Sequence, residues 1–344
     1  MRPDVVRALL DRNEVPCDLS AALVALAPYS VLVTGAGTLG TAICRLLAGQ
    51  VEELHCCDHS EVALYEMARE VPEASTHLCS VTMARQVGDL LSLTQAQVVI
   101  HTAAHKHVGL VEAMPRAGVK NNVGGLAALA SSAKAAGVRR LLLISSDKAV
   151  SPVCVYGATK HVCERLAYGF RGQAGLEVTV LRLVNLLGSS GSVLPIFESR
   201  LQQRLPLVVS HPDVERHFVT VSEAARAAVQ AAALSQAPLV TMPLFPPVRI
   251  ADLAQRVMEL HGRSETVLYT QLSPVEKLSE RPLYQDEVTE PADDLLICRQ
   301  PYPQPLLTTD SKFFGLKMAI TDGCPADVRA ALARLVSDDA EATT

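Results

Sequence analysis

An apolar run that ends in an acid and an amine is the first feature of chemical interest in this sequence. The run "LLLIS" is followed directly by Ser146, Asp147 and Lys148, and then by Tyr156 and Lys160. The apolar part predicts a buried strand, and on the helix expected next, residues four apart share a face. A neighbouring ammonium lowers the pKa of a phenol. Tyr156 is therefore a candidate for exchanging a proton with a hydroxyl group of a substrate.

A glycine-rich turn near the start predicts a binding site for a dinucleotide cofactor. The stretch "VTGAGTLG" places Gly35, Gly37 and Gly40 in G-x-G-x-x-G spacing between an expected strand and an expected helix. Asp58 ends the next expected strand, where a carboxylate can bond the ribose hydroxyls and repel a 2′-phosphate. We therefore predict NAD, favoured over NADP. The alternative role of Asp58 is to cap the helix that follows, and the two roles can coexist.

The elements that must position these residues alternate between short β-rich runs and longer helical patterns. We expect strands at 30–35, 53–58, 76–81, 96–103, 139–146 and 176–184, and helices at 38–50, 61–70, 111–136, 156–170 and 250–261. This alternation predicts an α/β fold, a Rossmann-type doubly wound parallel sheet with a smaller C-terminal substrate lobe. The expected parts are an N-terminal extension (1–26), an NAD-binding Rossmann domain (27–183, with returns near 217–250) and a mainly substrate-binding lobe (184–344).

Composition excludes several classes of function. The 344 residues are 49% hydrophobic, carry a formal net charge of −5 and have no strong basic block, so nucleic acid is not an expected partner. No apolar stretch has the length of a signal peptide or a membrane span, which favours a cytoplasmic protein. The nine scattered cysteines indicate buried thiols and not disulfides.

Two clusters resemble metal ligands but are better explained otherwise. His101, His105 and His107 lie close together in sequence, and "CCDH" adds thiols near Asp58. No expected helix aligns the three histidines, and adjacent cysteines point to opposite faces of a strand. We predict no metal site.

Taken together, five ordered segments resemble one family. These are "DHSEVALYE", "HTAAHKHVGLVEAMPRAGVKNNVGG", "ISSDKAVSPVCVYGATK", "LRLVNLLGSSGSVLPIF" and "HPDVERHF". They are similar to the extended short-chain dehydrogenases/reductases, and more narrowly to the CapD-type polysaccharide-biosynthesis branch, which includes the inverting UDP-N-acetylglucosamine 4,6-dehydratases. The resemblance covers most of the chain. It also implies that helices 111–136 and 156–170 could form a dimer face, so we expect a homo-oligomer.

The resemblance implies roles for the residues after the apolar run. Tyr156 would deprotonate the 4-hydroxyl of a UDP-sugar while NAD takes the hydride at carbon 4. Lys148 would then remove the acidified proton on carbon 5, and Asp147 would protonate the departing 6-hydroxyl. Ser146 stands where the family usually has threonine. Because opposite charges keep each other ionised, the sequence leaves open which of Asp147 and Lys148 holds the proton at each step.

The remaining predicted contacts are as follows. For the cofactor they are Gly35, Gly37, Thr38, Leu39, Gly40, Asp58, His59, Ser60, Ser80, Val81, Ala103, Ala104, Asn122, Tyr156 and Lys160. For the substrate they are Lys106, His107, Asn185, Ser192, Val193, Arg216 and Glu276. Arg216 has the fork-shaped donor that suits a diphosphate, and Asn185 would hold the nucleotide sugar.

The sequence also departs from the family, which keeps other functions open. The phosphate loop is one residue shorter, and "SPVEKL" keeps Glu276 and Lys277 but has Ser273 in place of arginine. These departures leave open a substrate other than UDP-N-acetylglucosamine. The alternatives to a 4,6-dehydratase are a nucleotide-sugar epimerase, a dehydratase of other regiochemistry, or a non-catalytic NAD-binding protein.

Overall fold

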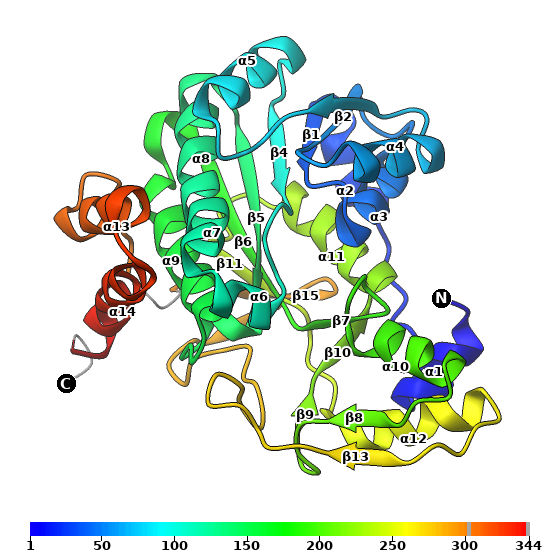
Figure 1. Cartoon of the computed structure of the whole chain (residues 1–344). Coiled ribbons are helices and arrows are strands. Elements are labelled where there is room, and N and C mark those ends of the chain that lie inside the picture. Colours follow the sequence, from blue (N-terminus) through cyan, green and yellow to red (C-terminus); the bar gives the residue numbers. More distant parts are fainter. Residues whose placement is uncertain (301–303, 342–344) are drawn as a thin grey trace.

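The buried apolar runs form a mostly parallel sheet at the centre of the molecule (Figure 1). The computed structural model describes residues 1–300 and 304–341. Within those residues the large sheet has the strand order β14-β15-β11-β6-β5-β4-β1-β2-β3. In this order, all strands from β11 to β3 are parallel to their neighbours on that side of the sheet. The pairs β11–β15 and β15–β14 are antiparallel. The order 3-2-1-4-5-6 is that of a Rossmann fold, so the predicted fold class is confirmed.

Six of these strands were expected from the sequence. They are β1 (Ser30–Thr34), β2 (Glu53–Asp58), β3 (Ser75–Leu78), β4 (Val98–His101), β5 (Arg140–Ser146) and β6 (Glu177–Leu183). All residues of β1 and β4 are buried, as expected for strands covered by helices on both faces. The strands that sequence reasoning missed are β11 (Leu239–Thr241), β14 (Thr289–Ala292) and β15 (Leu295–Cys298), which are too short to carry a periodic pattern.

Helices cover both faces of the sheet (Figure 1). One face carries α2 (Ser20–Leu26), α3 (Thr38–Leu47), α4 (Glu61–Glu70) and α11 (Val221–Ala233). The other carries α5 (Ala84–Thr94), α8 (Gly125–Ala135) and α9 (Val155–Phe170). Each face has its own apolar core, so the sheet is held rigidly between two layers. This rigidity fixes the positions of residues at the carboxyl ends of the strands.

The helix predicted at 111–136 is not continuous. It is divided into α6 (Val108–Ala113), α7 (Pro115–Val119), a π-helical turn (Lys120–Gly124) and α8. Pro115 explains the first break, because proline has no N–H to donate and pushes the preceding residue away from helical angles. Met114 accordingly has φ −125° and ψ 65°.

A C-terminal hairpin covers one of the expected dimer helices. Helices α13 (Ser311–Asp322) and α14 (Pro325–Glu341) lie on the outer side of α9 (Figure 1). Phe313, Leu332 and Leu335 are buried in the same core as α9. Our expectation that helix 156–170 forms a free dimer face is therefore wrong, because the chain's own C-terminal segment occupies that surface.

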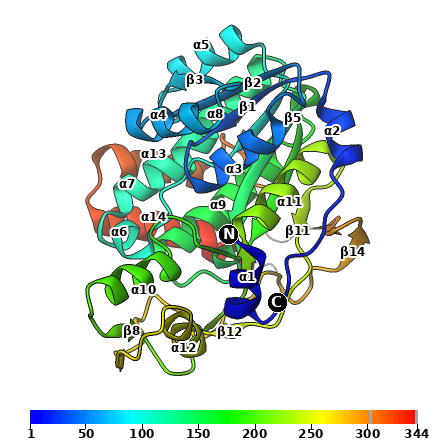
Figure 2. The same cartoon turned by 90° about the vertical axis from the view of Figure 1, so that its right-hand side faces the viewer.

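A smaller lobe lies beyond the carboxyl edge of the sheet (Figure 2). Its elements are α1 (Pro3–Leu10), β7 (Asn185–Leu187), α10 (Val193–Gln202), β8 (Leu207–Val209), β9 (Glu215–Arg216), β10 (Phe218–Thr220), β12 (Val248–Arg249), α12 (Ile250–Leu260) and β13 (Val267–Tyr269). Their apolar side chains form a third core. Helix α1 packs on α12, whereas α2 packs on α11, so the N-terminal helices are shared between the two parts. Among the described residues, no helix combines the length and apolarity needed to cross a bilayer.

Candidate active site

The acid and the amine that follow β5 lie in a short 3-10 turn, Asp147–Ala149. Ser146, the last residue of β5, donates its hydroxyl to Asp147 Oδ1 at 2.9 Å and accepts the backbone N–H of Lys148 at 3.3 Å. The Lys148 ammonium lies 3.2 Å from the same carboxylate oxygen. The serine therefore fixes the turn so that the two charged side chains stay together at the strand end.

Lys148 is held from three sides. Besides Asp147, its Nζ contacts Oδ1 of Asn185 at 3.3 Å and Oε1 of Glu280 at 3.7 Å. Its side chain is only 17% exposed. Asn185 begins β7, directly after β6, so the two predicted site residues Lys148 and Asn185 are brought together.

The second oxygen of Asp147 has no partner within the described residues. Asp147 is 1% exposed, and Oδ2 is buried without a hydrogen bond. A buried carboxylate oxygen without a donor carries a free-energy cost unless a further group binds there. The site therefore contains one carboxylate oxygen that could still accept a hydrogen bond or carry a proton.

Tyr156 and Lys160 lie in the first turns of α9 and are both buried. Lys160 donates to the carbonyl of Ile144 on β5 at 2.9 Å, and burial lowers the pKa of this amine. Burial also raises the pKa of the Tyr156 phenol, and a hydrogen bond with the Ser146 side chain works in the opposite direction. The lowered phenol pKa expected from the spacing is therefore wrong, because the desolvation penalty on the phenolate is larger.

His101, which could be mistaken for a metal ligand in the sequence, has a structural role. It ends β4 with an exposure of 3%, and its Nδ1 lies 2.7 Å from the hydroxyl of Thr34 on β1. Burial, and then the charge of Lys160, lowers the pKa of His101 to about 3. A neutral histidine is therefore fixed beside the lysine. No group of three or more His, Cys, Asp or Glu in the described residues could hold a metal ion.

The glycine loop has the geometry that a dinucleotide needs. Gly35 has φ +100°, and a side chain there would meet Thr102 Oγ1 at 2.6 Å. A side chain at Gly40 would meet the carbonyl oxygen of Gly35 at 1.8 Å. No side chain caps the N-terminus of α3 at Gly37, so its first N–H groups are available to an anion. Thr38 and Leu39 are the first residues of that helix.

Asp58 lies beside this loop, at the end of β2. Its Oδ2 accepts the N–H of Ala36 at 2.9 Å, and its Oδ1 accepts the N–H of Ser60 at 2.8 Å. A carboxylate has about four acceptor positions, so it keeps capacity for ribose hydroxyls. His59 lies 3.2 Å from Oδ1, and Ser60 caps α4. These residues fit the hydroxyls of an adenosine ribose.

The other predicted cofactor residues border the same edge of the sheet. Ser80 and Val81 follow β3, and Ala103 and Ala104 follow β4. Asn122 is different, because its amide is fully used. It accepts the N–H of His105 at 2.8 Å and donates to the carbonyl of that residue at 3.0 Å and to Thr159 at 3.0 Å. In this structure Asn122 holds a loop in place.

The predicted substrate residues form two groups. Lys106 contacts the hydroxyl of Ser189 at 3.3 Å, and the ring of His107 lies so close to Gly191 that a side chain there would clash at 2.4 Å. Ser192 and Val193 continue that loop into the N-terminus of α10. Arg216 and Glu276 form the other group, paired at 2.9 Å.

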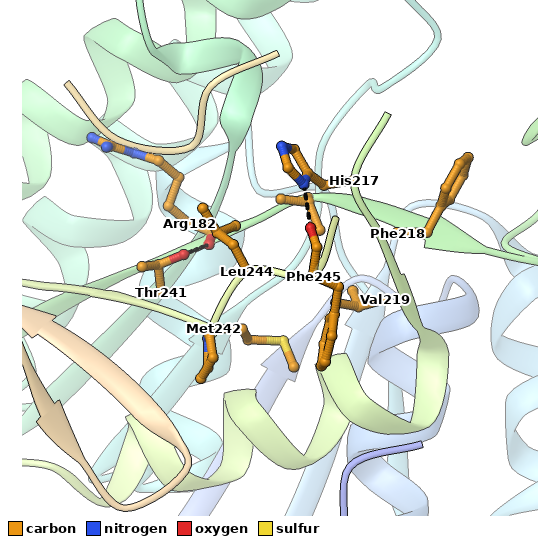
Figure 3. Close-up of a pocket in the computed structure, with 10 residues that line it drawn as sticks. Arg182, His217, Phe218, Val219, Thr241, Met242, Leu244 and Phe245 are labelled. Atoms are coloured by element: carbon orange, nitrogen blue, oxygen red, sulfur yellow. Dashed lines mark hydrogen bonds between the residues drawn. The ribbon is translucent and has the colours of Figure 1, made fainter. Parts of the chain in front are cut away.

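A cavity between β6, β10 and β11 is too small for a sugar. It encloses about 10 Å³, room for about one water molecule. Figure 3 shows His217 bonded to the carbonyl of Phe245 (2.7 Å) and the hydroxyl of Thr241 bonded to the carbonyl of Arg182 (3.0 Å). The cavity is part of the support behind the strands.

The order of these segments matches that of a known family. A family model described as "Polysaccharide biosynthesis protein" matches residues 31–299. The chain belongs to this family. It is 35% identical over 81% of its length to the probable polysaccharide biosynthesis protein EpsC of Bacillus subtilis, and 32% identical over 82% to the capsular polysaccharide biosynthesis protein CapD of Staphylococcus aureus. The predicted resemblance to the CapD-type extended short-chain dehydrogenases/reductases is confirmed.

The chain spans about half the length of these two relatives, 49% and 50%. It is also 26% identical over 65% of its length to a UDP-N-acetylglucosamine 4,6-dehydratase (inverting) of Campylobacter jejuni, covering 70% of that protein.

Solved structures agree on the fold of this CapD-type chain. Pen from Bacillus thuringiensis has a TM-score of 0.75 at 24% identity, covering 81% of this chain and 90% of that one. DesIV from Streptomyces venezuelae, a dTDP-glucose 4,6-dehydratase with NAD bound, has a TM-score of 0.66 at 21% identity, covering 73% and 87%.

Sequence reasoning missed two acids that support the site of this CapD-type chain. Glu280 contacts Lys148, and Glu112 accepts the N–H of Val155, next to Tyr156, at 2.9 Å. Glu112 is also paired with Arg329 of α14. The only signal for Glu280 was its place three residues after Lys277 in a proline-flanked stretch.

Proposed function

We propose that this protein is an NAD-dependent nucleotide-sugar 4,6-dehydratase that inverts carbon 5 of UDP-N-acetylglucosamine or a related UDP-sugar. The Campylobacter relative of that name supports the proposal. The observation that carries it is the Asp147–Lys148 pair at the end of β5, with one carboxylate oxygen buried and unpartnered. Elimination of water needs a base at carbon 5 and an acid at the 6-hydroxyl. Epimerisation at carbon 4 needs no acid or base at those two positions.

Several residues would hold the cofactor. The uncapped N-terminus of α3 and the Gly35–Gly40 turn would hold the pyrophosphate, and Asp58 would hold the adenosine ribose. When bound, NAD supplies a hydride acceptor at carbon 4 and returns the hydride to carbon 6. The NAD-bound structures of the same fold support this choice.

Tyr156 begins the reaction as the base on the 4-hydroxyl. Because its phenol is buried and resists ionisation, it depends on a neighbouring positive charge to lose its proton. Lys160, one turn further along α9, would supply that charge and would also hold the nicotinamide ribose. The Lys160 contact with Ile144 fixes the amine against β5.

For the elimination, the ammonium of Lys148 first passes a proton to the carboxylate of Asp147, 3.2 Å away, which leaves a neutral amine and a carboxylic acid. The 4-ketone acidifies the proton on carbon 5, and the amine of Lys148 takes that proton. Asp147 gives a proton to the 6-hydroxyl, which departs as water and leaves a double bond between carbons 5 and 6. After hydride return to carbon 6, which bound NAD would supply, carbon 5 would take a proton from water on the opposite face. The net change is the loss of one water with no net oxidation.

The diphosphate and the sugar of the substrate would bind to residues of the smaller lobe and of the loops that face it. Arg216 binds the diphosphate, Asn185 the sugar, and Lys106, His107, Ser192, Val193 and Glu276 line the same region. A homo-oligomer and a cytoplasmic location stay predictions of the sequence.

The test is incubation of the purified protein with a panel of nucleotide sugars, read by mass. Loss of one water supports a dehydratase, and NMR of the product assigns the 4-keto-6-deoxy sugar and its configuration at carbon 5. An unchanged mass with altered configuration would instead identify an epimerase. Stabilisation by NAD with no turnover of any sugar would identify a non-catalytic NAD-binding protein.

A further inference from the structure

A second buried carboxylate reaches the amine that the proposed function uses as a base. Glu280 is 4% exposed and comes from a segment about 130 residues further along the chain. Its Oε1 lies 3.7 Å from Lys148 Nζ, and its Oε2 lies 3.1 Å from Lys277 Nζ. Glu280 therefore links an amine of the site to an amine of its own segment.

The segment that carries Glu280 is anchored to the turn after β5. Lys277 donates to the carbonyl of Val150 at 2.6 Å. The hydroxyl of Tyr284 lies 3.1 Å from the Ala149 carbonyl and 3.1 Å from the Ser151 N–H. These bonds fix the position of Glu280 relative to Lys148 and do not depend on the Glu280–Lys148 contact.

The charges around Lys148 balance. Asp147 and Glu280 contribute two carboxylates, Lys148 and Lys277 contribute two amines, and the Asn185 amide is neutral. The thiol of Cys154 also senses the charge of Lys148, and burial raises the pKa of this thiol, which keeps it uncharged. Among these groups, Glu280 and Asp147 are the acids in contact with Lys148.

We propose that Glu280 is a positioning residue for Lys148 in the elimination step. This inference rests on the proposed function. When Lys148 takes the proton from carbon 5, a positive charge develops on a side chain that is almost buried. A fixed carboxylate at 3.7 Å stabilises that charge and keeps the amine directed at one carbon. The hydride transfer at carbon 4, which Tyr156 serves, does not use Glu280.

The experiment separates the two steps by following the bound cofactor. The holoenzyme is mixed with UDP-N-acetylglucosamine, and reduced NAD is followed by absorbance while water loss is followed by mass. In Glu280→Gln we expect reduced NAD to form at the normal rate and accumulate. Water loss should be slower by about 10²-fold, the order found for small misplacements in active sites. KM should stay close to that of the wild type.

Three further variants complete the test. Glu280→Asp keeps the charge and should recover part of the rate. Lys277→Gln, which frees Glu280 from its anchor, should show the same accumulation in milder form. Glu290→Gln is the matched control, because Glu290 is an exposed acid paired with Arg299 on the surface, and it should behave as the wild type. If Glu280→Gln fails to fold, the accumulation of reduced NAD in Glu280→Asp and Lys277→Gln tests the role of Glu280 instead.

Two results would overturn the inference, and they differ in meaning. If the wild type dehydrates the sugar and the folded Glu280 variants release water as fast, or lose activity without accumulating reduced NAD, only the role of Glu280 is wrong. If the wild type releases no water from any sugar in the panel, the proposed function fails, and the inference fails with it.

Discussion

At the scale of single residues, the proposed division of labour gives opposite signatures for two variants. Tyr156→Phe removes the base for the first step, so reduced NAD should not form and turnover should fall by about 10²–10⁴-fold. Asp147→Asn removes the acid for the second step, so reduced NAD should form but no water should be lost. Absorbance and mass on the same sample measure both.

The control for this pair is Tyr65→Phe. Tyr65 is 65% exposed on α4, and its variant should turn over normally. Accumulation of reduced NAD in Tyr156→Phe would contradict the assignment of Tyr156 to the first step.

His101 predicts a pH dependence of stability. Its pKa in the folded protein is about 3, below the ordinary value of about 6.5. Below about pH 6.5 the unfolded chain takes up a proton that the folded protein refuses. The stabilisation is therefore complete above that pH and is lost as pH falls toward 3, with a slope of up to about 1.4 kcal/mol per pH unit.

Denaturant unfolding across that pH range measures this slope. His101→Gln should flatten it, whereas the same change at the exposed His261 should not. An equal slope in wild type and His101→Gln would exclude His101 as its source.

The sequence predicted the central residues of the site because they are close together along the chain. Asp147, Lys148, Tyr156 and Lys160 span one strand end and one helix start, so local spacing determines their placement. Glu280 could not be predicted in this way, since its contact with Lys148 depends on where a loop of the other lobe folds.

At the scale of elements, the glycine turn before α3 gives a sharp test. Gly40→Ala places a methyl group 1.8 Å from a backbone oxygen, so the turn must move. We expect a destabilisation of about 1–3 kcal/mol, the usual cost of overpacking, and weaker NAD binding. Thermal unfolding and NAD titration measure the two effects.

Gly88→Ala is the matched control for that variant. Gly88 lies inside α5, and a side chain there meets nothing within 4 Å. It should stabilise the protein by about 0.5–1 kcal/mol, the ordinary gain for replacing glycine in a helix. Equal effects of the two substitutions would show that the turn tolerates a side chain.

Sequence patterns predicted the elements that are long and periodic. The strands at 30–34 and 140–146 are buried apolar runs, and the pattern was sufficient. It failed for β11, which has three residues and is fixed by pairing with β6 and β15. It also failed at Pro115, where an apolar helical pattern continues through a break in the backbone.

At the scale of the whole molecule, the C-terminal hairpin should contribute to stability. Leu335 in α14 is fully buried against the layer that contains α9. Leu335→Ala should therefore cost about 2–5 kcal/mol of unfolding free energy, as usual for a large-to-small core change. Arg334→Ala, next to it and exposed, should cost little. Urea unfolding compares the two, and equal midpoints would contradict the packing of α14.

The sequence did not predict this hairpin. Its docking surface on α9 is apolar, and an apolar helix face is equally compatible with a second subunit and with a later part of the same chain. Only the position of residues 311–341 in the fold distinguishes them, and no local pattern contains that information.

The two hydrogen bonds that Asp58 accepts limit how the proposed preference for NAD over NADP could be redesigned. The usual strategy for admitting a 2′-phosphate is to replace the acid with a small neutral residue. Here that change would also remove the acceptors for Ala36 and Ser60, so the phosphate loop and the start of α4 would lose support together. A successful swap would need a compensating acceptor nearby, and selecting at position 58 alone should return weakened proteins rather than NADP enzymes.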